Sequence, residues 1–342
     1  MNSTIVHSQC AAPASDFGDV RAEFEHLRSG CGVFDLSTRA KLAITGGDRV
    51  RWLNGMVTNN VRDLASGRGV YAFLLNPQGH ILGDLYAYNR GESLIVDTEQ
   101  SQSDNVLAVF DRYIIMDDVV VANLNDTLTG VGVAGPQAGQ SLRTAGFDPA
   151  GMERLQFKDM TWEGKPVTIT RGDNPAVDWY EIWLAPGEVA ALRDALITAG
   201  ARPVGSSALE LLRIASGVPR YGIDIRERDL PQETEQERAL NFNKGCYIGQ
   251  EIVERIRSRG AVHRKFSGFV AEAALPQPGT KVQTDGKDVG EVTSSAALPL
   301  EERNVALGYI RREMATPGKE LLADGVRLTV APLPFAGIFP AN

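Results

Sequence analysis

The chain has 342 residues, of which 43% are hydrophobic, and it carries a formal net charge of −8. This composition is typical of a globular protein that buries a substantial core and has room for two or three domains. The negative charge argues against a broad nucleic-acid-binding surface, so we expect no direct nucleic-acid partner. Three cysteines without C-x-x-C spacing argue against a disulfide framework or a cysteine zinc site, and we predict no metal site.

The first residues contain no cationic region followed by an apolar stretch. No apolar run approaches the roughly 18 residues of a membrane-spanning helix. We therefore expect a cytoplasmic protein with no membrane partner. Residues 1–15 are small and polar, and we assign no role to His7 or Cys10 within them.

Residues 16–130 combine helical and strand patterns, and the two strand pairs around a helix between residues 70 and 124 indicate a small α+β unit. Helices are expected at residues 16–30, 49–57 and 100–112, and strands at residues 33–37, 41–44, 70–75, 81–88, 93–96 and 113–124. Asp16 is positioned to cap the first helix. The turn Asn76-Pro77-Gln78-Gly79 has Pro and Gly at positions that suit a hairpin between antiparallel strands.

The second half of the chain changes character near residue 265. Before it, a second α+β unit is expected, with strands at residues 131–134, 165–171 and 179–184 and a helix at residues 189–199. After it, short strands are broken by Gly and Pro, which is typical of a small β-barrel.

The most unusual stretch is Lys244-Gly245-Cys246-Tyr247-Ile248-Gly249-Gln250-Glu251, which gathers a cation, a thiol, an amide and a carboxylate. The glycines indicate a backbone with special dihedral angles, and Gly249 can open either a helix or a strand. If a helix starts here, its N-terminus and Lys244 would favour the thiolate of Cys246. The alternative is that Cys246 is a small apolar residue packed in a tight turn.

This octapeptide resembles the signature of the YgfZ proteins, which are folate-binding relatives of the glycine cleavage system T protein, an aminomethyltransferase. T proteins usually carry Asp where Cys246 stands. Residues 212–219 and 230–233 resemble the segments that precede the signature in that family, and the resemblance covers nearly the whole chain.

The resemblance implies an α+β fold of T-protein type. It is a three-domain ring around a central ligand channel, built from two ferredoxin-like α+β units plus a C-terminal small β-barrel. The expected domains are a discontinuous folate-binding domain at residues 16–52 with 131–262, an inserted α+β domain at 53–130, and a C-terminal barrel domain at 263–342.

Several polar residues near the signature suit the donor-rich edge of a pterin. Carboxylates can accept two N–H bonds from a guanidine-like fragment, and an amide adapts to either polarity. The candidates are Glu233, Gln250 and Glu251, beside Cys246. The alternative for Glu251 is an ion pair with Arg255 on a helix.

Arg255, Arg257 and Arg259 alternate with other residues, which on a strand would place three guanidinium groups on one face. Such a face would be a local anion site suited to the glutamate tail of a folate or to phosphates, and Arg257 is the residue that we select from it. The alternative is a solvated strand face balanced by Glu251 and Glu254.

Further candidates follow from the resemblance alone. T proteins typically have two adjacent acids where Gly83 and Asp84 stand, and one acts on the folate nitrogen. Asp84 is then either the retained functional acid, or Gly83 marks the loss of that acid. Glu181 matches a Glu that faces the pterin, although residues 174–179 replace a glycine-rich loop. Lys244 and Tyr247 of the signature are also expected to contact the folate.

The leading hypothesis is a tetrahydrofolate-binding protein with the pterin in the channel and Cys246 beside it as the functional thiol. The resemblance implies a role in assembling or repairing iron–sulfur clusters in a subset of enzymes, including tRNA-modifying ones. Fe–S enzymes or assembly proteins would be its partners. The alternative is a folate-dependent aminomethyltransferase or demethylase-like one-carbon transferase with Asp84 as the polar catalyst. A third possibility is a scaffold that binds proteins without a small ligand.

Overall fold

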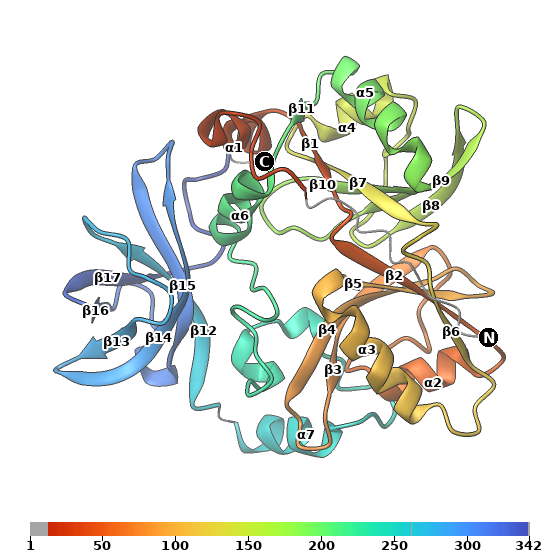
Figure 1. The fold of residues 1–342 in the computed structure, drawn as a ribbon. Coiled ribbons are helices and arrows are strands. Elements are labelled where there is room, and N and C mark those ends of the chain that lie inside the picture. The colour runs from red at the N-terminus through yellow and green to blue at the C-terminus, as the bar shows by residue number, and fades with distance from the viewer. Residues whose placement is uncertain (1–12, 261, 341–342) are drawn as a thin grey trace, which may run out of the picture.

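The computed structural model of the protein describes residues 13–260 and 262–340. Two β-sheets with their helices and a closed six-stranded barrel form three lobes (Figure 1). The expected α+β fold with a C-terminal β-barrel is thereby confirmed. His7 and Cys10 lie outside the described residues. Within the described ranges, no helix combines the length and apolarity needed to cross a bilayer.

The first sheet has the strand order β11-β1-β7-β10-β9-β8. Its strands are β11 (Arg202–Pro203), β1 (Gly32–Asp35), β7 (Thr129–Ala134), β10 (Trp179–Leu184), β9 (Lys165–Arg171) and β8 (Phe157–Trp162). Helices α4 (Ala138–Thr144) and α5 (Val189–Thr198), the latter preceded by η1 (Pro186–Glu188), cover one face with buried aliphatic side chains. Because side chains alternate along β10, Tyr180 and Ile182 enter this core while Glu181 points to the opposite face.

The second sheet is antiparallel, with the order β3-β4-β5-β2-β6. Its strands are β3 (Arg68–Leu75), β4 (Ile81–Asn89), β5 (Leu94–Glu99), β2 (Arg39–Thr45) and β6 (Val120–Asn123). Helices α2 (Arg49–Met56) and α3 (Gln100–Tyr113) pack on it around Leu53 and Phe110. The expected strand at 113–124 was too long, because the helix continues to Tyr113 and pairing starts only at Val120.

Strand β2 lies in the second sheet and helix α2 packs on that sheet. The expected domains instead joined residues 16–52, which contain β2 and the start of α2, to residues 131–262. Leu42 pairs with Val96 of β5 on one side and Asn123 of β6 on the other. We therefore propose that the boundary between the two α+β units lies between β1 and β2, after Asp35, and not at residue 52.

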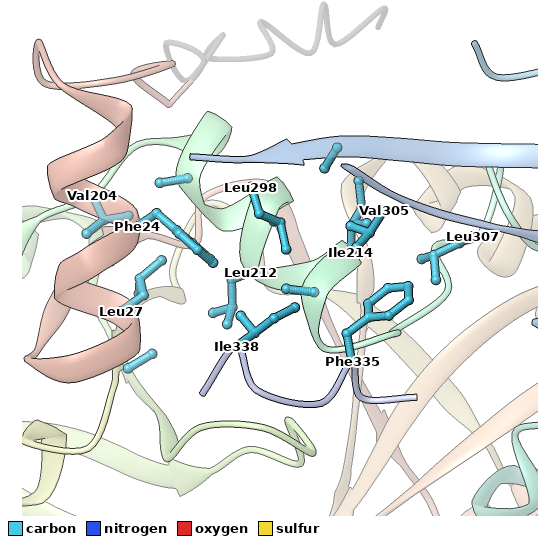
Figure 2. Packing of buried hydrophobic residues seen from close by; sticks show 14 of the residues in the cluster. Phe24, Leu27, Val204, Leu212, Ile214, Leu298, Val305, Leu307, Phe335 and Ile338 are labelled. Atoms are coloured by element: carbon cyan, nitrogen blue, oxygen red, sulfur yellow. The ribbon is translucent and has the colours of Figure 1, made fainter. Parts of the chain in front are cut away.

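The closed barrel has the order β12-β15-β14-β13-β16-β17. Its strands are β12 (Arg264–Ala271), β15 (Arg303–Arg311), β14 (Lys287–Leu298), β13 (Lys281–Thr284), β16 (Glu320–Ala323) and β17 (Val326–Ala331), with η4 (Arg312–Met314) after β15. Helices α1 (Val20–Ser29) and α6 (Ser206–Ala215) join the barrel to the first sheet. Figure 2 shows this junction, in which Phe24 and Leu212 approach Leu298.

The cap of α1 differs from the expectation. Asp19, not Asp16, accepts hydrogen bonds from the first backbone N–H groups of the helix, those of Arg21 and Ala22. Asp16 instead accepts a bond from Gly18 N in the preceding turn. Both residues are suitable caps by type, and Asp19 is the cap because the helix begins at the next residue, Val20.

The segment between α6 and the barrel packs against the hairpin of β3 and β4. It contains η2 (Pro231–Thr234), η3 (Glu237–Ala239) and α7 (Gln250–Arg259). Arg255 and Arg257 therefore lie on a helix, so of the two possibilities left open after Gly249 the helix is formed, and the arginine face that a strand would have made is not. Val253 is fully buried and Ile252 and Ile256 are partly buried, a three-to-four spacing that favours a helix over the alternation of the arginines.

Candidate functional site

A central cavity of about 700 Å³ lies between the two sheets and is closed by α6 and the segment that follows it. Its size is within the range of small-molecule and cofactor sites. Aromatic side chains form much of its wall, and the ring centroids are 4.6 Å apart for Phe34 and Trp179 and 5.0 Å apart for Tyr71 and Tyr86. Of the residues selected from the sequence, Asp84 and Glu181 line this cavity.

Asp84 is held by hydrogen bonds from two neutral donors. The hydroxyl of Tyr71 on β3 donates to its Oδ2 at 2.7 Å, and Nε2 of Gln102 on α3 donates to its Oδ1 at 2.8 Å. Burial, together with the charge of Asp84, raises the pKa of Tyr71 well above its usual value, so this phenol stays a hydrogen-bond donor. The carboxylate retains free lone pairs on the cavity side.

The alternation of β4 decides which of the two positions, 83 or 84, can serve the cavity. A Cβ on Gly83 would lie 3.1 Å from Oε1 of Gln102 and 3.6 Å from Val106, on the α3 side of the sheet. Asp84 therefore faces the cavity, and a side chain at position 83 would not.

Glu181 is another of the carboxylates that line the cavity, and it is only 9% exposed. The indole N–H of Trp183 donates to its Oε2 at 2.9 Å, and that of Trp179 donates to its Oε1 at 3.2 Å. Two neutral donors thus orient the carboxylate while leaving it further acceptor capacity. Arg39, whose guanidinium is bound to Asp97 at 3.1 Å, adds positive charge to the same wall.

Arg238 and Asp173 are cavity residues that the sequence analysis missed. They form an ion pair, and the Arg238 guanidinium lies 4.5 Å from the centroid of the Tyr71 ring. Burial raises the pKa of Asp173, while Arg238 opposes that shift. Both residues also line a second cavity of about 540 Å³ beside the barrel, so their ion pair stands between the two cavities.

The cysteine of the signature lies elsewhere. Cys246 is exposed and lines neither of the two cavities. It precedes α7 by four residues, with Gly249 as the N-cap at φ 82°. A Cβ on Gly249 would lie 2.6 Å from the backbone oxygen of Asn76, so the glycine allows the signature to pack closely on the β3–β4 turn.

Lys244 is buried, and its ammonium group donates to the backbone oxygens of Asn54, Val57 and Asn59. Burial, together with the charge of Arg62, lowers the pKa of Lys244 to about 7. All three donors of the ammonium are used, so Lys244 does not reach the central cavity and instead fixes the C-terminal end of α2.

The remaining signature residues are also packing or helix-start residues. Tyr247 is buried against the β3–β4 hairpin, and burial raises its pKa to about 12. Gln250 starts α7, and its Oε1 accepts a bond from the Tyr247 N–H at 3.2 Å. Glu251 is exposed, and it is Glu254 that pairs with Arg257, at 3.6 Å.

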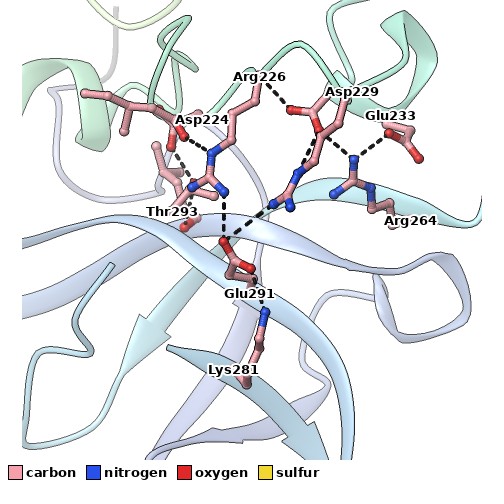
Figure 3. A network of polar contacts seen from close by, with 11 residues as sticks. Asp224, Arg226, Asp229, Glu233, Arg264, Lys281, Glu291 and Thr293 are labelled. Carbon is pink, nitrogen blue, oxygen red and sulfur yellow. Dashed lines mark hydrogen bonds and ion pairs between the residues drawn. The ribbon is translucent and has the colours of Figure 1, made fainter. Parts of the chain in front are cut away.

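Glu233 and Arg257 lie outside the central cavity as well. Glu233 and Asp229 share the guanidinium of Arg264, at 2.9 and 2.6 Å, in a network that ties the segment before α7 to the barrel (Figure 3). Arg257 stacks on Phe242, with its guanidinium 4.5 Å from the ring centroid. Among the described residues, no group of three or more His, Cys, Asp or Glu is arranged to hold a metal ion.

Comparison with known proteins agrees with this architecture. Residues 8–244 match the model of the GCVT N-terminal domain, and residues 264–335 match that of the glycine cleavage T-protein C-terminal barrel domain. An aminomethyltransferase from Rubrobacter xylanophilus is 29% identical over 324 residues, which cover 93% of this chain and 87% of the relative. One from Geobacillus kaustophilus is 27% identical, with 96% of each chain covered.

A solved structure has the same fold. The crystal structure of the glycine cleavage system aminomethyltransferase T from Bartonella henselae superposes with a TM-score of 0.85 and 24% sequence identity. The superposition covers 94% of this chain and 91% of the other.

Proposed function

Because the chain belongs to the glycine cleavage T-protein family, we propose that it binds tetrahydrofolate in the central cavity. The observation that carries this proposal is the pair of carboxylates, Asp84 and Glu181, that line a cavity with aromatic walls. The relatives named aminomethyltransferase, which align over almost the full chain, support the same reading.

The residues present fit a reduced pterin. Its edge offers several N–H donors, and Asp84 and Glu181 each have lone pairs beyond those used by Tyr71, Gln102 and the two indoles. The aromatic rings of Phe34 and Trp179 suit the flat heterocycle. Arginines of the cavity wall, such as Arg193 and Arg220, provide charge for the carboxylates of a glutamate tail.

Within this site, Asp84 is the residue placed to accept a proton or hydrogen bond from a folate nitrogen. Tyr71 remains protonated and keeps Oδ2 of Asp84 in place, and Glu181 orients the heterocycle through its N–H edge. The bound folate would supply the one-carbon chemistry. We propose on this basis a folate-dependent one-carbon transferase of aminomethyltransferase type as the first candidate activity.

The test of folate binding is a calorimetric titration with tetrahydrofolate under anaerobic conditions. Asp84→Asn and Glu181→Gln should each weaken binding by about tenfold, because a neutral amide accepts N–H bonds less strongly than a carboxylate does. Asp104→Asn is the matched control, since Asp104 is exposed on α3 and does not line the cavity. Unchanged affinity in both cavity variants would contradict the proposed site.

A second candidate function rests on Cys246. Its thiol is exposed and outside the cavity, so a protein partner can reach it while a folate is bound. We propose, as the resemblance of its segment to the YgfZ signature implies, that this thiol supports the assembly or repair of iron–sulfur clusters in partner enzymes, including tRNA-modifying ones.

The two candidates differ in the residue on which activity depends. Formation of methylene-tetrahydrofolate from an aminomethyl donor, with release of ammonia, should be lost in Asp84→Asn and kept in Cys246→Ala if the protein is a transferase. Rescue of Fe–S enzyme activity in a deletion strain should be lost in Cys246→Ser if the thiol carries the function. Full rescue by Cys246→Ser would exclude the second candidate.

A further inference from the structure

Gln102 is a buried polar residue next to the central cavity that does not line it. It lies in the first turn of α3, is 3% exposed, and uses both ends of its amide on a single residue. Its Nε2 donates to Oδ1 of Asp84 at 2.8 Å, and its Oε1 accepts the backbone N–H of Asp84 at 3.0 Å. Gln102 therefore ties the side chain and the backbone of Asp84 to the same helix.

These bonds leave Asp84 little freedom. Tyr71 holds Oδ2 from β3 while Gln102 holds Oδ1 from α3, so the plane of the carboxylate is fixed from two elements. Without the amide, the side chain could rotate about its χ angles and the ligand would have to reorder it on binding.

Gly83 makes this arrangement possible. A Cβ at position 83 would lie 3.1 Å from Oε1 of Gln102, which is closer than an ordinary contact, so any side chain there would press on the amide. A carboxylate at position 83 would also repel Oε1 electrostatically. The absence of a side chain at Gly83 and the two hydrogen bonds of Gln102 to Asp84 thus belong to one local structure.

We propose that Gln102 is a positioning residue for Asp84 and that Gly83 is needed because it leaves the space for the Gln102 amide. This inference rests on the proposed function, since it assigns to Asp84 the contact with the folate. Gln102 itself is placed behind the cavity wall and acts only through Asp84.

The first test compares tetrahydrofolate affinities. Gln102→Met keeps the length of the side chain but removes both hydrogen bonds, and it should weaken binding by about tenfold. Gln140→Met, at an exposed position of α4, is the matched control and should leave the dissociation constant unchanged. A dissociation constant for Gln102→Met within twofold of wild type would overturn the positioning role.

A second variant gives a readout that a purely structural role would not produce. In Gln102→Glu, a carboxyl faces Oδ1 of Asp84, and the two groups can regain a hydrogen bond only by sharing a proton. Its affinity relative to wild type should therefore recover as the pH falls from 8 to 5. The other groups near Asp84 are the phenols Tyr71, Tyr86 and Tyr221 and the guanidinium of Arg238, which keep their charge in this range.

The role of Gly83 is tested by measuring whether the effect of Gly83→Ala on tetrahydrofolate affinity depends on the residue at position 102. Gly83→Ala should weaken binding in the wild-type background, because the new methyl group forces the Gln102 amide to shift by a few tenths of an ångström away from Asp84. The same change should have no further effect in Gln102→Ala, where the space is empty. Equal losses in both backgrounds would contradict the link between the two positions.

Failure of the proposed function is distinguishable from failure of this inference. If wild type does not bind tetrahydrofolate, the proposed function fails. The interaction between Gln102 and Asp84 is then tested by thermal unfolding of Gln102→Met, Asp84→Ala and the double variant. If the melting temperature of the double variant is no lower than that of the less stable single variant, the two residues act as one unit and the inference is supported. Additive losses in melting temperature overturn it.

Discussion

Replacing Lys244 by Met tests the role that the structure gives to the signature lysine. Met keeps an unbranched apolar stem but has no donor for the backbone oxygens of Asn54, Val57 and Asn59. These oxygens lie at the C-terminal end of α2, where carbonyl groups lack partners within the helix. The substitution therefore leaves three buried acceptors unsatisfied.

The loss of stability follows from these contacts. An unsatisfied buried acceptor costs about 1 to 3 kcal/mol, and part of the total is offset because the desolvated ammonium is removed as well. The contact between the ammonium and the Tyr247 ring, 4.9 Å from its centroid, is lost too. We expect the free energy of unfolding to fall by about 3 kcal/mol near pH 7.

The pH dependence has a defined sign. The pKa of Lys244 is lowered by burial, then by Arg62, from 10.5 to about 7 in the folded protein. Between these values the unfolded chain binds more protons than the folded one, so stability from this group rises with pH, by at most about 1.4 kcal/mol per unit. This contribution of Lys244 to stability is fully present above pH 10.5 and is lost as the pH falls through 7. The difference in the free energy of unfolding between wild type and Lys244→Met should therefore increase from pH 6 to pH 9.

The assay is urea unfolding followed by tryptophan fluorescence, to which Trp52 of α2 contributes. Lys158→Met is the matched control, because Lys158 is exposed on β8 and its loss should change stability by less than about 0.5 kcal/mol. The reasoning would be refuted if Lys244→Met were as stable as wild type, or if the difference in stability between them did not change with pH.

Three further experiments probe other parts of the account. Arg264→Met leaves the carboxylates of Asp229 and Glu233 without their shared cation. The urea assay should show the free energy of unfolding falling by about 3 kcal/mol. A fall of less than about 1 kcal/mol would contradict a stabilising role for the network in Figure 3. Glu181→Gln should weaken tetrahydrofolate binding by about tenfold in calorimetry without lowering the melting temperature by more than a few degrees. The Cys246 thiol, which is exposed, should react with a soluble maleimide at a rate that saturating folate does not change, and protection by folate would place the thiol at the folate site.

The parts of the fold set by local pattern were predictable. The hairpin at Asn76-Pro77-Gln78-Gly79 and the barrel strands have strong turn residues and alternating side chains. The choice between helix and strand at α7 stayed open because the alternation of Arg255 and Arg257 is typical of a strand. The buried Val253 and its partly buried neighbours followed the helical period instead.

The candidate site was predictable only in part, because it is assembled from elements far apart in the chain. Asp84 and Glu181 were selected through the resemblance, and both line the cavity. Tyr71, Gln102 and Arg238 carry no local signal, since their partners are brought to them by the sheet pairing and by the segment before α7. A glycine within the expected strand at Gly83 was visible in the sequence, but only the structure shows its close neighbours, Gln102 and Val106 of α3.

The central claim is that a reduced folate occupies the cavity between the two sheets, bound by Asp84 and Glu181. Anaerobic calorimetric titration with tetrahydrofolate, run on wild type beside Asp84→Asn and Cys246→Ala, tests it most directly. The account predicts saturable binding that the Asp84 change weakens by about tenfold and the Cys246 change leaves intact. Absence of binding by wild type, or binding that depends on Cys246 and not on Asp84, would contradict it.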